Sequence, residues 1–162
     1  MNGPDEELYH HTELETAVLR GNRERFRELF DKSALDHRSD NGSTLLHKAV
    51  VAGSDGIVKE LIERGIDLDA ENEAEQTPLH IAVKEGHESI AATLVEAGAD
   101  PNAQDTNGVV PLFEVVYRNQ TDLAELMVEH GVDPGIESDG GVSPLDIVEE
   151  HDMVEMRDVL FQ

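Results

Sequence analysis

A short amphipathic pattern recurs along the chain, and residues 77–82 (TPLHIA) show it in full. Thr77 can cap the start of a helix, and Pro78 suits the first helical position because its fixed φ is already helical. Leu79 and the alanine three residues later share one helix face. His80 can both donate and accept hydrogen bonds, so it can bond nearby backbone or hydroxyl groups. The pattern predicts a short helix with one apolar face.

The same stretch returns every 33 residues, and so do glycines that can end a second helix in the left-handed conformation. A period of 33 with a T-P-L-H-x-A core resembles the ankyrin repeat signature over roughly residues 8–162. The resemblance implies an all-α fold, an ankyrin-repeat α-solenoid whose helix-turn-helix repeats are joined by β-hairpin-like fingers. The equivalent positions are Thr44, Thr77, Val110 and Ser143 at helix starts, and Gly65, Gly98 and Gly131 at helix ends.

The resemblance divides the chain into a leader and one repeat domain. Residues 1–7 are polar and acidic, and we expect them to be disordered. Thr12 stands in the capping position of the first repeat, which is one residue short. Both end repeats depart from the pattern as terminal caps do, so we expect a monomer. The domain covers residues 8–162, with five repeats at approximately 8–40, 41–73, 74–106, 107–139 and 140–162.

The last two repeats differ from the pattern at particular positions. Phe113 and Asp146 stand where the other repeats have histidine, and Glu149 occupies a position for a small residue. Asn119 replaces the glycine between two helices, and we expect it to be left-handed because asparagine tolerates that conformation.

The formal net charge is −24 at pH 7, from 36 acidic and 12 basic residues. Residues 1–65 hold nine bases and 13 acids (net −4), whereas residues 66–162 hold three bases and 23 acids (net −20). Nucleic-acid binding depends on Lys and Arg displacing phosphate counterions, and anionic membrane surfaces repel acidic proteins. We therefore expect neither nucleic acid nor a membrane as a partner.

Two interpretations of the acidity stay open. The acids are scattered over every repeat and only four lysines are present, as in cytosolic proteins of halophilic archaea, so we favour adaptation to high salt. Alternatively, the acidic surface attracts a basic partner. The chain has no cysteine, and no apolar run approaches the ~20 residues of a membrane span, so we expect a cytoplasmic protein.

No motif indicates catalysis, a metal site or a cofactor. His47 and His80 occupy equivalent positions, and we interpret both as structural. The run that starts at Asp67 fails as a calcium loop, because its sixth and twelfth positions are Asn72 and Pro78. One basic cluster is present, and we favour its pairing with nearby acids such as Glu24 and Glu28 over an anchor for an acidic partner. The cluster consists of Arg20, Arg23, Arg25 and Arg27.

Ankyrin repeat proteins usually bind a protein on their concave face, formed by the finger tips and the exposed side of each first helix. The resemblance therefore implies a non-catalytic interaction module, an adaptor or regulator. Tyr117 and Arg118 are the hypothesised anchors, because both residue types are enriched in binding hot spots. The alternative is an acidic inhibitor or DNA mimic that occupies a basic groove through the residues after 65. The predicted contact positions are Arg20, Asp40, Asn41, Val51, Glu73, Gln76, Lys84, Thr106, Val109, Tyr117 and Arg118, and the same rows include Leu19 and Val142.

Overall fold

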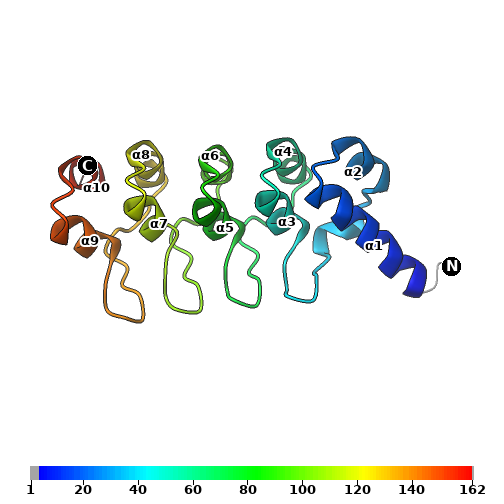
Figure 1. The fold of residues 1–162 in the computed structure, drawn as a ribbon, viewed down its shortest axis with the longest axis horizontal. Helices are drawn as coiled ribbons and strands as arrows, with labels where there is room; N and C mark the ends of the chain where they lie inside the picture. The colour runs from blue at the N-terminus through cyan, green and yellow to red at the C-terminus, as the bar shows by residue number, and fades with distance from the viewer. Residues whose placement is uncertain (1–3, 162) are drawn as a thin grey trace.

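Helix pairs stand side by side in chain order and form an elongated all-α solenoid (Figure 1). The computed structural model describes the backbone of residues 4–161 and the side chains of residues 12–161. Within that part of the chain there are ten α-helices, one 3-10 segment and no strand, which confirms the predicted fold class. The first helices of the pairs are α1 (Pro4–Leu19), α3 (Leu45–Val51), α5 (Pro78–Glu85), α7 (Leu112–Tyr117) and α9 (Pro144–Glu150). The second helices are α2 (Arg23–Leu29), α4 (Asp55–Glu63), α6 (Glu88–Glu96), α8 (Thr121–Glu129) and α10 (Val154–Leu160), and the 3-10 segment η1 (Lys32–Asp36) follows α2.

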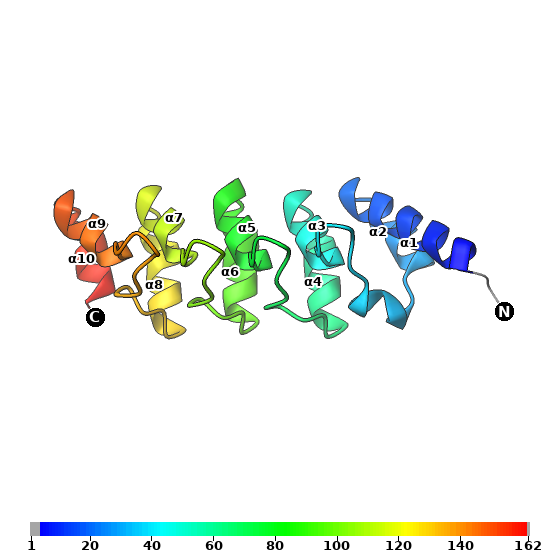
Figure 2. The ribbon, with the colours of Figure 1, turned by 90° about the horizontal axis from the view of Figure 1, so that it is seen from below.

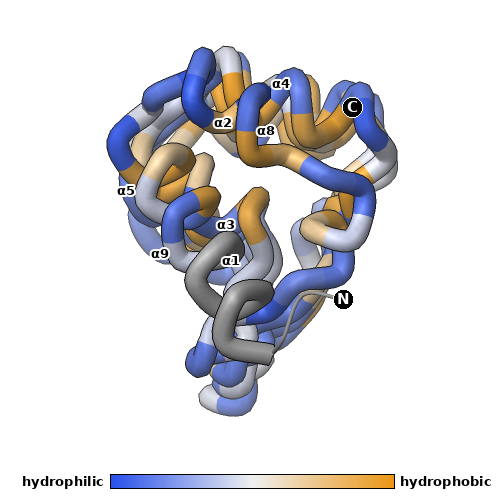
Figure 3. Tube along the Cα trace, turned by 90° about the vertical axis from the view of Figure 1, so that its right-hand side faces the viewer, coloured by the Kyte–Doolittle hydropathy of each residue, from blue (hydrophilic) through white to orange (hydrophobic). Residues whose placement is uncertain are grey.

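One apolar core runs through the whole row of pairs. Leu46, Leu79 and Leu112 occupy equivalent positions in successive first helices, and each is fully buried. Leu145, the next in this series, is only partly buried, because no further pair covers it in the described part of the chain. Figure 3 looks along the solenoid and shows hydrophobic positions between the two helix layers, whereas the loops below are mostly hydrophilic.

A residue in the left-handed conformation follows within two residues of the end of each first helix. Asn119 has φ 54°, which confirms the prediction for this position. Its N–H donates to the carbonyl of Val116 at 2.9 Å, and the next N–H donates to Val115 at 3.0 Å. The same turn recurs in all five pairs, with positive φ at Gly21, Gly53, Gly86, Asn119 and Asp152.

Four fingers project from the layer of first helices, and Figure 2 shows the row from the finger side. In each finger an N–H bonds the carbonyl four residues later, for example Asn72 to Gln76 at 3.1 Å. Neighbouring fingers are also bonded to each other, for example Thr106 N–H to the carbonyl of Ala74 at 3.1 Å. The fingers are therefore a connected ladder of turns, at residues 39–43, 72–76, 105–109 and 138–142.

The N-terminal end differs from the sequence-based expectation. Residues 1–3 of the predicted leader lie outside the described residues, whereas residues 4–7 form the first turn of α1 in place of a disordered segment. Pro4 begins the helix, at the position where proline is favoured. Thr12 therefore lies inside α1 and not at its N-cap, and its carbonyl accepts a bond from the Thr16 hydroxyl at 2.8 Å. No helix among residues 4–161 is both long and apolar enough to cross a membrane.

We predict that Glu75→Gly stabilises the protein by about 0.5–1 kcal/mol. Glu75 has φ 55° in a finger position that Gly42, Gly108 and Gly141 occupy in the other fingers. The left-handed conformation costs a residue with a side chain about 1–2 kcal/mol, which exceeds the entropic cost of a glycine, about 0.5–1 kcal/mol. Urea unfolding measures the change. Glu73→Gly, two residues away and outside the left-handed region, is the control and should destabilise; equal effects at both positions would contradict the prediction.

Candidate functional site

The finger face, defined as the finger tips together with the last turns of the first helices, carries most of the exposed apolar side chains. Within the described part of the chain six large apolar side chains are exposed, and four of them lie on this face. Their exposed fractions are 48% for Leu19, 52% for Val51, 81% for Tyr117 and 41% for Val142. The finger face corresponds to the concave face named in the sequence-based expectation.

A hollow of about 340 Å³ opens on this face between α5, α7 and the finger at 105–109. Its inner wall combines apolar side chains with one imidazole: Val83 and Val110 are buried, Phe113 is partly buried, and the buried His80 also lines the hollow. Its rim is polar and includes Asp105, Asn107 and Glu114. Three of the predicted contact residues, Gln76, Lys84 and Val109, also line it.

Tyr117 stands beside this hollow. It lies four residues after Phe113 on α7, so the two side chains share one face of the helix. Phe113 lines the hollow, whereas the Tyr117 side chain is 81% exposed. The hollow and the most exposed aromatic residue of the described chain therefore form one surface.

Arg118 is held by contacts within the protein. Its Nε donates to the carboxylate of Glu114 at 2.6 Å, and its Nη2 donates to the carbonyl of Lys84 at 2.7 Å. The second bond satisfies a carbonyl in the last turn of α5, so Arg118 links two neighbouring first helices. Its side chain remains 40% exposed, so part of the guanidinium group still faces solvent.

The remaining predicted residues are spread along the finger face. Asp40, Asn41, Glu73 and Thr106 are exposed on three different finger tips. Asn41 is partly engaged there, because its side-chain oxygen accepts bonds from Ser39 Oγ at 2.7 Å and from Ser43 N–H at 3.2 Å.

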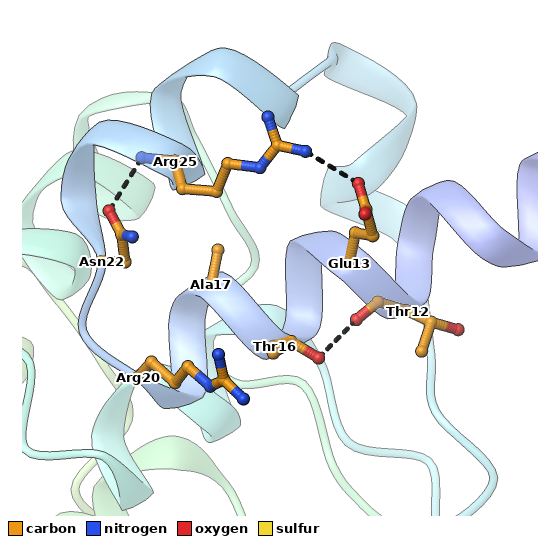
Figure 4. A pocket seen from close by; sticks show the side chains of 7 residues that line it. All are labelled: Thr12, Glu13, Thr16, Ala17, Arg20, Asn22 and Arg25. Carbon is orange, nitrogen blue, oxygen red and sulfur yellow. Dashed lines mark hydrogen bonds and ion pairs between the residues drawn. The ribbon is translucent and has the colours of Figure 1, made fainter.

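Arg20 lies at the N-terminal end of the solenoid, apart from the other predicted residues. It lines a separate hollow of about 240 Å³ between α1 and α2. Figure 4 shows Arg25 reaching Glu13 across this hollow, while Arg20 lies on the other side of Ala17. The structure therefore brings Gln76, Lys84, Val109, Tyr117 and Arg118 together and leaves Arg20 outside that group.

Two buried histidines hold the fingers against the helices. His80 Nδ1 accepts a bond from the N–H of Thr77 at 3.2 Å, and a backbone N–H can only donate. The ring proton of the neutral imidazole is therefore on Nε2, which donates to the carbonyl of Val109 in the next finger at 2.9 Å. His47 makes the equivalent bonds to Thr44 and to the carbonyl of Gln76.

The environment of both histidines favours the neutral form. Burial lowers the pKa of His47 and of His80 below the ordinary value of 6.5. The structural interpretation of the two histidines is thus supported by their bonds. In α9, Asp146 replaces the histidine by accepting bonds from the N–H and hydroxyl of Ser143 at 2.7 and 2.6 Å.

Three of the four arginines of the basic cluster pair within the protein, two of them with a residue that the sequence did not point to. Arg25 bonds Glu28 at 3.0 Å, as expected, and also Glu13 at 2.9 Å. Arg23 and Arg27 instead both bond Glu60, a buried residue of α4. These arginines, with Arg27 contributing most, lower the pKa of Glu60.

The other contacts of Glu60 show why sequence analysis did not identify it as a partner of the basic cluster. Arg64, the residue that follows α4, also approaches the Glu60 carboxylate at 3.6 Å, and its guanidinium lies 4.2 Å from the ring centre of Phe30. The pairing with α2 depends on how two helix pairs stack, and no local spacing encodes it. Among the residues that line the hollow, Phe113 stood out in the sequence because it occupies a position where His47 and His80 stand in the two preceding repeats.

The arrangement is suited to recognition of shape and charge. Among the residues described, no group of three or more His, Asp or Glu side chains is placed to hold a metal ion. Two of the acidic groups that line the hollow are engaged within the protein: Asp105 accepts bonds from the N–H groups of Asn107 and Val109 at 2.9 and 3.1 Å, and Glu114 pairs with Arg118.

Comparison with known protein families agrees with this repeat architecture. A family model described as "Ankyrin repeats (3 copies)" matches residues 14–105. The helix pairs and fingers continue with the same spacing beyond that range, to α10. Comparison with curated proteins found no match.

We predict that His47 and His80 make the protein less stable as the pH falls below about 6.5. Because burial lowers their folded-state pKa, the unfolded chain takes up these protons first. The stability is fully present above the ordinary pKa and is lost as the pH falls from there toward the lowered values.

The comparison is between the wild type and His47→Gln/His80→Gln, since glutamine can complete the same helix cap without titrating. Urea unfolding at pH 7.5 and 5.5 should show a larger loss for the wild type. His151→Gln, at an exposed position, is the matched control. Identical pH dependence in the wild type and the double variant would rule out this role for the histidines.

Proposed function

This chain belongs to the ankyrin repeat family, and we propose that it is a non-catalytic adaptor or regulator whose protein partner docks on the finger face. Ankyrin repeats are generally protein–protein interaction modules. The family model matches three copies, and we propose that the five helix pairs are five repeats.

The observation that carries the proposal is the position of the exposed apolar side chains. Four of the six in the described chain lie in two rows on the finger face, and they are interspersed with polar residues. Apolar side chains rimmed by polar groups are characteristic of protein-binding surfaces. The backbone beneath them is fixed by the ladder between fingers and by the two histidines, so little ordering is required on binding.

Within this face we propose Tyr117 as the central contact. An exposed tyrosine offers a large rigid surface at low entropic cost. Arg118 supports it by bonding α5 to α7, and its exposed edge is available to the partner. Val51 and Leu19 extend the same row toward the N-terminal end.

The alternative, an acidic inhibitor or DNA mimic, would use a different part of the surface. Its contacts would be the carboxylates of residues 66–162, which carry a net charge of −20. Such binding would weaken steeply with salt and would be insensitive to loss of the Tyr117 ring. Binding through apolar contacts on the finger face would instead depend little on salt and would weaken when the Tyr117 ring is removed.

We predict that Tyr117→Ala weakens the partner complex at least tenfold, about 1.4 kcal/mol, because truncating a central aromatic contact removes most of its buried area. The partner would be captured from lysate of the source organism with the wild-type chain, and its affinity then measured with purified proteins at two salt concentrations. Val154→Ala is the matched control, since Val154 is 48% exposed at the start of α10, a second helix that carries none of the proposed contacts.

Unchanged affinity for Tyr117→Ala and Tyr117→Ala/Arg118→Ala would refute docking at this point of the face. Equal losses for Tyr117→Ala and Val154→Ala would show that the partner does not distinguish the two surfaces.

A further inference from the structure

We propose that the hollow between α5 and α7 takes one large apolar side chain from a partner protein, and that a Lys or Arg adjacent to it in the partner pairs with acidic finger tips. This inference rests on the proposed function and specifies the chemistry of the partner. It follows from the size of the hollow, from its apolar wall and from the distribution of charge on its two sides.

The size and lining of the hollow suit a single side chain. Its volume, about 340 Å³, lies at the lower end of the range for pockets that enclose small ligands, about 300–1,000 Å³. Val83, Val110 and Pro111 form a buried apolar floor, and Phe113 adds an aromatic wall. Phe113 stands where His47 and His80 stand in the two preceding repeats, so it adds an apolar ring where they have an imidazole. His80 itself also lines the hollow, and its Nε2 is already bonded to the carbonyl of Val109.

Charge differs between the two sides of the hollow. On the helix side, Lys84 and Arg118 are basic, and Arg118 is paired with Glu114. On the finger side, Asp105 lines the hollow.

The neighbouring fingers extend the acidic side. Glu73 and Asp139 are exposed on the fingers before and after the one that borders the hollow. Backbone bonds hold these fingers in contact: Thr106 N–H to Ala74 carbonyl at 3.1 Å, and Asp139 N–H to Asn107 carbonyl at 2.9 Å. A partner with an apolar side chain in the hollow therefore places its next residues between basic helix ends and acidic finger tips.

The charge of the surrounding chain decides which sign the partner carries. Residues 66–162, which contain the hollow, hold 23 acids and three bases. Two of those three bases are Lys84 and Arg118, and each is on the helix side. Complementary charge speeds encounter and fixes orientation, so the fitting segment is basic and turns its Lys or Arg toward the fingers.

A library of random 12-residue peptides displayed on phage, selected on the full chain in ~0.15 M KCl, is the probe. We expect the enriched peptides to share a large apolar residue within two positions of Lys or Arg. Their affinities, measured by fluorescence anisotropy with synthetic peptides, would be compared between the wild type and variants in two matched pairs.

The first pair tests the hollow. Val109→Phe fills it and should weaken binding at least tenfold, whereas Val142→Phe makes the same change at the equivalent position 33 residues later, on the finger face but outside the hollow, and should have a smaller effect. Replacing the apolar residue of the peptide by Ser should weaken binding to the wild type and have little further effect on Val109→Phe. Because the peptide substitution is measured on the wild-type chain, it tests the apolar contact even if Val109→Phe alters the fold.

The second pair tests the charge. Glu73→Gln/Asp139→Asn removes two carboxylates from the flanking fingers and should weaken binding several-fold and reduce its salt dependence. Asp122→Asn/Glu125→Gln changes the net charge equally on the exposed side of α8 and should have a smaller effect.

The outcomes separate this inference from the proposed function. Peptides that lose affinity with Tyr117→Ala but not with Val109→Phe would overturn the hollow as the binding point and leave the finger face intact. Peptides insensitive to both would overturn both. Failure to enrich any peptide, or enrichment of peptides without the apolar–basic pair, would also overturn the inference.

Discussion

No helix pair in this protein can bury its own apolar surface, and every other feature of the structure depends on this constraint. From α3 onward each pair consists of helices of six to nine residues with an apolar face, and burial of apolar area is the main stabilising contribution to a fold. Leu46, Leu79 and Leu112 are fully buried only because the next pair covers each of them. The chain is thus stable as a row, in which each pair supports its neighbours.

The row in turn fixes the finger face. A carbonyl in each of two fingers accepts a bond from a histidine of the preceding pair, and neighbouring fingers bond one another. The fingers therefore cannot move independently, although they contain no regular strand among the residues described. A surface with this rigidity can carry exposed groups such as Tyr117 at fixed separations, which is what a partner of defined shape requires.

Sequence predicted those features that arise within one repeat. The 33-residue period, the left-handed Asn119 and the structural histidines all follow from local chemistry, and the structure bears them out. Features that depend on stacking could not be predicted. Glu60 meets arginines 33 and 37 residues away, and Arg118 bonds a carbonyl 34 residues away. The hollow likewise requires the relative placement of α5 and α7, for which Phe113 was the only local signal. The start of α1 at Pro4 was missed because an acidic opening segment was interpreted as a disordered leader.

The central claim is that partner recognition takes place on the finger face, and hydrogen exchange of the complex tests it most directly. Amide exchange by mass spectrometry would compare the free chain with the chain bound to its captured partner. The account predicts new protection in the fingers at 72–76 and 105–109 and in the last turn of α7, with α6 and α8 unchanged. Protection concentrated on α6 and α8, with the fingers unaffected, would contradict it.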